Sequence, residues 1–161
     1  MTDPLVLPPG KFFRAEEFAC HDGTPYPIDW RDRWLELRDL SDGARIIHGG
    51  PLDVVSGYRT PTYNADLFAA STAAGTHGVA SSSEHIEGNA GDMRARIAPA
   101  SALYSELLIA YQDDFRFTNA DGKERRFRDL LGGIGVYPIS NWVHIDTRKA
   151  PDGHLRRWHG R

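Results

Sequence analysis

Glycine and proline residues are spread along the whole chain, and no repeat, low-complexity tract or linker interrupts the pattern. With 16 glycines and 10 prolines among 161 residues, the sequence favours short helices and strands over long ones. A chain of this length can bury one core, and a second domain is not expected. We therefore predict a single domain over residues 1–161, opened by an extended segment over residues 1–10 that ends in Pro8, Pro9 and Gly10.

Apolar spacing along the chain predicts an α+β fold. Helical periodicity favours helices over residues 30–40, 61–74 and 99–114. Alternating or β-branched runs favour strands over residues 51–60, 91–97, 132–138 and 141–148. A turn at Asp121 and Gly122 indicates a hairpin over residues 115–127. Because hairpin-like pairs dominate, we expect a small antiparallel sheet flanked by helices, followed by a polar tail whose Trp158 packs back on the sheet.

Charge and composition exclude several classes of function. The formal net charge is −3 and the basic residues are scattered, so a nucleic-acid partner is not expected. No apolar run approaches the roughly 20 residues that span a bilayer, and the opening "MTDPLVLPPG" lacks the regions of a signal peptide. We expect a monomer that is synthesised in the cytoplasm. The single Cys20 forms no internal disulfide, so any metal must be held by histidine and carboxylate.

The stretch "SSSEHIEGNAGDMR" places His85 and Asp92 seven residues apart. Gly88 and Gly91 lie between them and would cost a helix about 1 kcal/mol each, so a loop leading into a strand is the better prediction. Such a loop can fold the imidazole back beside a carboxylate that projects from the strand. This arrangement suits two ligands of a tetrahedral zinc ion, although a His-x6-Asp pair is common by chance.

A third candidate ligand lies in "NWVHIDTR", where His144 is flanked by the apolar residues Val143 and Ile145. Side chains two residues apart in a strand share a face, so Trp142, His144 and Asp146 should point the same way. If Val143 and Ile145 face the core, the polar pair faces a cleft, where Asp146 acts as a base or orients the imidazole. The alternative is an ordinary hydrogen bond between His144 and Asp146 at the sheet surface.

Taken together, these segments resemble the M15 zinc peptidases, in the branch of D-Ala-D-Ala carboxypeptidase-like and murein endopeptidase-like domains that includes phage lysins. The resemblance rests on "SGYRTPTYNADL", on "SSEHIEGNAGDM" and on "GGIGVYPISNWVHIDTR". The second of these fits the pattern Ser-x-His-x-x-Gly-x-Ala-x-Asp. The segment "EFACHDGTPYP" also resembles the opening of the family, and the four segments occur in the family's order from about residue 18 to residue 158.

The resemblance implies a zinc D-Ala-D-Ala peptidase/hedgehog-like fold, with a Zn²⁺ ion held by His85, Asp92 and His144. It also implies that Arg59 binds the oxyanion or a substrate carboxylate, where the alternative is a surface arginine at a turn. Ser83 is a candidate for binding a ligand or substrate, or is ordinary loop polarity. The implied reaction is zinc-dependent hydrolysis of a peptide bond in peptidoglycan stem peptides or cross-links, and the implied partner is peptidoglycan or a muropeptide.

One position departs from the family. Many members carry the catalytic Glu or Asp three residues before the last metal ligand, and Asn141 stands there in this sequence. Asp146 is our candidate base, and Glu84 or Glu87 are alternatives. A second possibility is a catalytically inactive zinc-containing binding module of the same fold, and a third is a hydrolase of ordinary L-peptides.

The remaining histidines are assigned ordinary roles. His21 is expected to form a loop hydrogen bond or to line the cleft, and His48 and His77 are expected to face solvent. His154 and His159 belong to the basic tail "GHLRRWHGR", which, like "KERRFR", is either a solvated surface or a contact for anionic cell-wall polymer. The absence of an export signal favours a phage-type lysin, a secreted effector or an enzyme of cytosolic muropeptides, acting at the cell wall after release in the first two cases.

Overall fold

The computed structural model describes residues 6–76 and 78–161, so part of the predicted 1–10 segment and the prediction for His77 lie outside the described residues. The main sheet has five strands in the order β1-β2-β6-β5-β7. Its strands are β1 (Leu52–Ser56), β2 (Ala90–Ala95), β5 (Gly133–Tyr137), β6 (Trp142–Asp146) and β7 (Arg156–His159). A separate two-stranded hairpin consists of β3 (Arg116–Thr118) and β4 (Glu124–Arg126).

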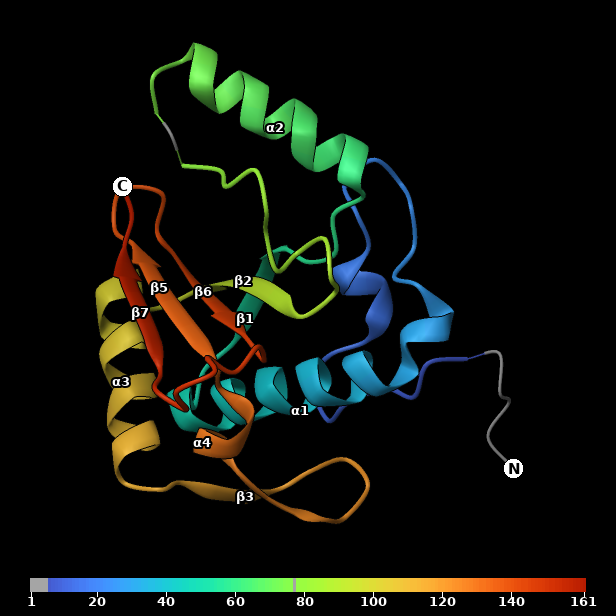
Figure 1. The fold of residues 1–161 in the computed structure, drawn as a ribbon. Helices are drawn as coiled ribbons and strands as arrows, with labels where there is room; N and C mark the ends of the chain where they lie inside the picture. The colour runs from blue at the N-terminus through green and yellow to red at the C-terminus, as the bar shows by residue number, and fades with distance from the viewer. Residues whose placement is uncertain (1–5, 77) are drawn as a thin grey trace.

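Within residues 6–76 and 78–161, four α-helices and two 3-10 helices accompany the sheet. They are α1 (Arg31–His48), α2 (Pro61–Ala73), α3 (Ala100–Gln112), α4 (Phe127–Leu130), η1 (Ala15–Phe18) and η2 (Ile28–Trp30). Figure 1 shows α1 and α3 against the sheet, whereas α2 stands apart from both of them. The α+β class predicted from the sequence is confirmed. Among the described residues, no helix is both long enough and apolar enough to cross a membrane.

The core lies between one face of the sheet and the helices α1 and α3. In β6, Val143 and Ile145 are fully buried, as is Met93 in β2. The helices contribute Leu37 from α1 and Leu103 from α3 to the same cluster. Because side chains alternate along a strand, the opposite face of β6 carries Trp142, His144 and Asp146, and it is therefore free to build a site.

Helix α1 runs eight residues beyond the predicted end at residue 40. The helix continues through Gly43. A side chain at this position would meet the Phe117 ring of β3 at 2.9 Å, so the glycine lets the hairpin pack closely against the helix. The helix ends at Gly49, which adopts a left-handed conformation with φ of 68°. His48, in the last turn, was predicted to face solvent, and this was wrong. Its ring is buried, with Nδ1 2.7 Å from a carboxylate oxygen of Glu106.

The C-terminal tail forms a fifth strand that the sequence did not predict. Strands β1, β2, β6 and β5 pair antiparallel, as expected, whereas β7 adds parallel to β5, with Gly135 opposite Trp158. Four residues with two arginines and one histidine carry little strand signal of their own, so the pairing depends on tertiary contacts. Trp158 packs back on the sheet as predicted, and it occupies the space above Gly135, where a side chain would approach the indole at 2.3 Å.

Candidate metal centre and cleft

A cleft of about 630 Å³ lies on the sheet face opposite α1 and α3. Strands β1, β2, β6, β5 and β7 supply its floor, and α2 with the following loop supplies one wall. The larger apolar side chains of that wall that line the cleft are Tyr63, Leu67 and Val79. The polar and charged residues that line it are His21, Ser56, Arg59, Ser82, Ser83, Glu84, His85, Asp92, Asp146, His144, Arg148 and Arg156.

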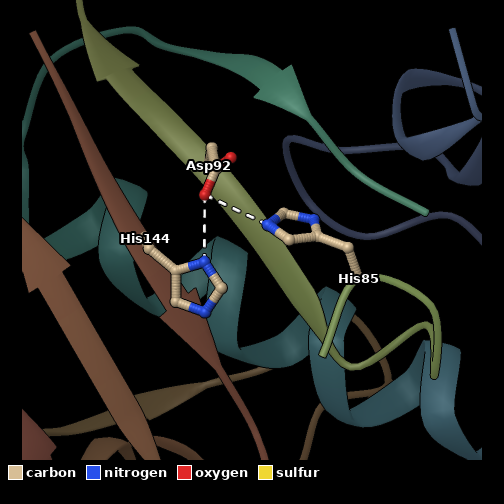
Figure 2. A group of neighbouring side chains, drawn as sticks. All are labelled: His85, Asp92 and His144. Carbon is tan, nitrogen blue, oxygen red and sulfur yellow. Dashed lines mark hydrogen bonds and ion pairs between the residues drawn. The ribbon is translucent and has the colours of Figure 1, made fainter. Parts of the chain in front are cut away.

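The three predicted metal ligands meet at the floor of this cleft. Asp92 lies in β2 directly opposite His144 in β6, and the loop before β2 brings His85 to the same point. One oxygen of Asp92, Oδ1, lies 3.2 Å from His85 Nε2 and 3.0 Å from His144 Nδ1. Figure 2 shows both imidazoles approaching this carboxylate. All three residues are buried, and one ligand atom from each lies within 4.8 Å of the others.

Local contacts fix the loop that carries His85. Gly88 has φ of 68°, a conformation that favours glycine, and its carbonyl accepts a hydrogen bond from the Tyr26 hydroxyl at 2.6 Å. The His85 carbonyl accepts the backbone N–H of Arg59 at 3.0 Å, which ties the loop to the end of β1. The predicted loop leading into a strand is therefore present, and Gly88 is necessary for its shape.

The second nitrogen of each imidazole is held by an acceptor. His85 Nδ1 lies 2.6 Å from the carbonyl oxygen of Gly57, and His144 Nε2 lies 3.1 Å from Asp146 Oδ2. If these nitrogens carry the protons, the other nitrogen of each ring has its lone pair directed at the meeting point. Metal-binding histidines are commonly oriented by such acceptors. Two imidazole nitrogens and one carboxylate oxygen therefore fit a zinc ion with an open fourth position.

Burial and the mutual charges of the cluster shift its proton affinities. Burial lowers the pKa of His85. For His144 burial also opposes the charged form, but hydrogen bonds to Asp146 and Asp92 outweigh it and raise the pKa to about 9. Burial would raise the pKa of Asp92, but the two imidazoles outweigh this effect and hold the pKa well below its usual range. Asp92 is thus an ionised carboxylate at neutral pH, which is the form that binds a metal.

Arg59 and Ser83, the two candidate substrate-binding residues, both line the cleft. Arg59 follows the end of β1 and donates from Nη2 to Asp92 Oδ2 at 3.3 Å and from Nε to the Ser56 hydroxyl at 3.1 Å. Ser83 accepts the backbone N–H of His85 at 3.3 Å, so its hydroxyl helps to form the turn that carries His85. The arrangement brings Arg59 into direct contact with the His/Asp/His group.

Asp146 is enclosed by partners. It is fully buried, its Oδ2 lies beside His144, and its Oδ1 accepts the backbone N–H of Arg148 at 3.0 Å and the guanidinium of Arg156. Gly133 makes room for this carboxylate, because a side chain there would approach Asp146 Oδ2 at 2.3 Å. Of the two roles considered for Asp146, these contacts favour orientation of the imidazole.

Strand β7 adds cleft residues that the sequence predicted to lie in a polar tail. Besides Arg156, it places the Trp158 ring 5.1 Å from the His144 ring, measured between centroids. Trp158 Nε1 donates to the Tyr137 hydroxyl at 3.0 Å, and Tyr137 also lines the cleft. Spacing relative to the parallel strand β5 would have revealed these residues, but only if β7 had been recognised as a strand.

The position that departs from the family pattern has a structural role. Asn141 lies in the turn before β6 with φ of 58°, and its side-chain oxygen accepts the backbone N–H of Ala100 at the start of α3. Asparagine tolerates this left-handed conformation. Glu84 lines the cleft and pairs with Arg148, whereas Glu87 pairs with Arg33.

The other histidines divide between the cleft and the surface. His21 lines the cleft, and its ring lies 6.2 Å from that of Tyr63. His154 is exposed beside Asp152. His159, at the end of β7, packs against Tyr104 of α3.

The fold and the cleft define a small α+β protein with a buried His/Asp/His group suited to a metal ion. Comparison with curated proteins finds peptidoglycan L,D-endopeptidases. The chain is 30% identical over 114 residues to the probable peptidoglycan L,D-endopeptidase MepK of Haemophilus influenzae, a match that covers 71% of this chain and 46% of the relative. It is 32% identical over 108 residues to peptidoglycan L,D-endopeptidase MepK of Escherichia coli K12 and of Shigella flexneri, covering 67% of this chain and 43% of each relative.

These matches confirm the M15-like murein endopeptidase relationship that the sequence predicted. The chain spans less than half the length of the curated relatives that it matches. No family model matches the sequence. No solved structure matches it either.

Proposed function

We propose that this chain is a zinc-dependent peptidase that hydrolyses a peptide bond in the stem peptides or cross-links of bacterial peptidoglycan. The observation that carries the proposal is the convergence of His85 Nε2 and His144 Nδ1 on Asp92 at the floor of a cleft. The names of the relatives support peptidoglycan as the substrate, and they favour an endopeptidase over a carboxypeptidase.

In this proposal, His85, Asp92 and His144 hold the zinc ion. A zinc ion bound there would supply an acidified water and would polarise the scissile carbonyl. Asp146 orients His144 by accepting its Nε2–H, and Gly57 does the same for His85 through its carbonyl. Arg59, fixed by Asp92 and Ser56, stabilises the negative charge that develops on the carbonyl oxygen, and Ser83 holds the turn beside the substrate.

The proton acceptor is assigned by exposure. Side chains of three carboxylates line the cleft, and their exposed fractions are 12% for Glu84, 6% for Asp92 and 0% for Asp146. Asp92 is committed to the metal and Asp146 to His144, so we assign proton transfer to Glu84.

A second candidate function is a zinc-containing binding module without hydrolytic activity. It is favoured by the pairing of all three cleft carboxylates with protein partners, since Glu84 contacts Arg148, Asp92 contacts Arg59, and Asp146 contacts Arg156. A carboxylate whose oxygens already accept hydrogen bonds from protein donors has fewer free positions at which to take up a proton.

The test is mass spectrometry of defined muropeptides, both monomers and cross-linked dimers, incubated with zinc-loaded protein and with a His85→Ala control. A product that appears with the intact protein but not with the control supports the peptidase, and its mass identifies the bond. Intact muropeptides alongside bound zinc would contradict the peptidase and support the binding module. Cleavage of casein-like substrates in place of muropeptides would move the substrate class to ordinary L-peptides.

A further inference from the structure

The arginines and the carboxylates that line the cleft are equal in number but not equally engaged. Three arginines, Arg59, Arg148 and Arg156, face three carboxylates, Glu84, Asp92 and Asp146. All three carboxylates accept from protein donors. Asp92 accepts from Arg59, and Asp146 accepts from Arg156 and from the backbone N–H of Arg148. For Glu84, Oε1 accepts from Arg148 Nη1 and Oε2 lies 3.4 Å from the side-chain nitrogen of Asn89. The cleft therefore offers few free acceptors to a ligand.

Arg148 is the arginine with the most unused hydrogen-bonding capacity. Its side chain is 55% exposed, compared with 13% for Arg59 and 28% for Arg156. Among the described residues, its guanidinium is hydrogen-bonded through Nη1 to Glu84, and Nε and Nη2 have no protein partner. A guanidinium presents its donors in a planar fork that matches a carboxylate.

The position of Arg148 is fixed by the site itself. Its backbone N–H donates to Asp146 Oδ1, the same carboxylate that orients His144, and its backbone carbonyl accepts from Arg156. Glu84, next to His85 in the chain, holds the side chain from the other side. An ordinary surface ion pair has two mobile, exposed partners and contributes little. Here the acidic partner is largely buried and the backbone is tied to the site, so the guanidinium is held at the cleft with two donor nitrogens available.

We propose that Arg148 binds a carboxylate of the substrate, so that the cleft selects acidic peptides with a free carboxyl group near the scissile bond. This inference rests on the proposed function and adds a specificity residue to it. The apolar wall formed by Tyr63, Leu67 and Val79 contacts the aliphatic part of the same peptide. An amide in place of the carboxylate would lose the charge that the guanidinium pairs with.

The experiment compares pairs of muropeptides that differ in a single carboxyl group, of D-glutamate or of diaminopimelate, which is free in one member and amidated in the other. In at least one of these pairs, the wild-type protein is expected to favour the free acid over the amide by about ten- to a hundredfold in kcat/KM, because hydrogen bonds to charged groups contribute about 1.5–3 kcal/mol. In Arg148→Gln the preference should vanish through a higher KM for the free acid. Arg148→Lys, which keeps the charge but loses the fork, should retain a reduced preference.

The preference ratio separates substrate binding from other effects. Removing Arg148 also changes the surroundings of Glu84, but that change affects both members of a pair equally and cancels in the ratio. Arg96→Gln is the matched control, because Arg96 pairs with Asp53 at an exposed position that does not line the cleft. It should leave the ratio unchanged.

The inference is overturned if the wild-type protein shows no preference within any pair, or if Arg148→Gln retains the wild-type ratio. Failure of the proposed function is a different result, in which the wild-type protein cleaves neither member of any pair. In that case calorimetric binding of the same pairs to the wild-type protein and to Arg148→Gln tests Arg148 by itself. An acid preference that depends on Arg148 would support the inference, and equal binding of acid and amide would contradict it.

Discussion

Two groups of charged residues in this molecule are buried to a similar extent at their centres, but their side chains are arranged differently. The first, which we call the hairpin network, joins α1 to the β3–β4 hairpin and consists of Glu36, Arg38, Asp39, Asn119, Asp121 and Arg125. The second, the cleft cluster, consists of His85, Asp92, His144 and Asp146. Both contain carboxylates that are almost completely buried, so burial alone does not tell a structural group from a functional one.

The hairpin network pairs permanent charges of opposite sign. Asp39 accepts from Arg38 Nε and Nη2 on one oxygen and from Asn119 and Arg125 on the other. Arginine has no lone pair to offer a metal, and its charge does not change near neutral pH. The network therefore connects elements and leaves nothing to bind a ligand.

The cleft cluster directs groups with lone pairs at one point. Both imidazoles approach the same oxygen of Asp92, their other nitrogens are held by Gly57 and Asp146, and the group opens on a cleft. What separates the two groups is the convergence of ligand atoms. Substitutions in each group should therefore affect different properties.

The largest effect is expected from His144→Ala. It removes one of three proposed ligands, so zinc content should fall from about one ion per chain to near zero and muropeptide cleavage should fall below detection. Elemental analysis and mass spectrometry of the products measure the two quantities. His48→Ala is the matched control, because His48 is a buried histidine paired with Glu106 outside the cleft. Full zinc binding by His144→Ala would contradict the proposed ligand set.

Asp39→Asn should show the opposite pattern. It leaves the buried guanidinium of Arg38 short of a partner, and breaking a buried ion pair costs about 3 kcal/mol or more of unfolding free energy. Urea denaturation measures the loss, while zinc content should stay at the wild-type level. Glu36→Gln, at the exposed edge of the same network, should cost less than about 1 kcal/mol. Zinc loss in folded Asp39→Asn would show that the two groups are coupled.

Asp146→Asn sharpens the assignment within the cleft cluster. If Asp146 orients His144, the substitution should weaken zinc affinity by about 10- to 100-fold, as loss of a partner behind a metal ligand typically does. Glu84→Gln should keep zinc affinity and lower kcat, by about 10²-fold or more if Glu84 transfers the proton. Competition with a chelator measures affinity, and steady-state kinetics measure kcat. Unchanged affinity with a lower kcat in Asp146→Asn would instead make Asp146 the base.

The sequence was sufficient for the parts of the site that local patterns encode. The alternation around His144 predicted that Trp142, His144 and Asp146 share one face of β6, and Gly88 and Gly91 predicted a loop before Asp92. These predictions agree with the structure because each depends on backbone preferences within a few residues. The α+β class followed from the same patterns.

The features that the sequence did not predict depend on contacts between residues far apart in the chain. Strand β7 has a weak strand signal of its own. It forms because two glycines of β5 make room for neighbouring side chains. Gly133 makes room for Asp146 and Arg156, and Gly135 makes room for Trp158. The enclosure of Asp146 follows from that pairing. Arg148 became notable once its partners were known, since one arginine in a polar segment carries no signal by itself. Likewise, the helical spacing of α1 gave no indication that its Arg38 and Asp39 would be buried under a hairpin.

The smallest predicted effect concerns the exposed edge of the hairpin network. A hydrogen bond from Arg38 holds the pKa of Asp121 below its usual range. A carboxylate with a lowered pKa in the folded state stabilises the fold above its unfolded pKa of about 3.9, and this stabilisation is lost as the pH falls through the folded value. Asp121 is 47% exposed, so we expect its charge to contribute less than about 1 kcal/mol to the unfolding free energy.

In urea denaturation between pH 7 and pH 3, Asp121→Asn should be less stable than wild type at pH 7 and approach it at pH 3. Asp66→Asn on α2, where no ion pair is formed among the described residues, should parallel wild type throughout. An Asp121→Asn deficit that persists at pH 3 would assign the effect to packing of the hairpin and not to the charge of Asp121.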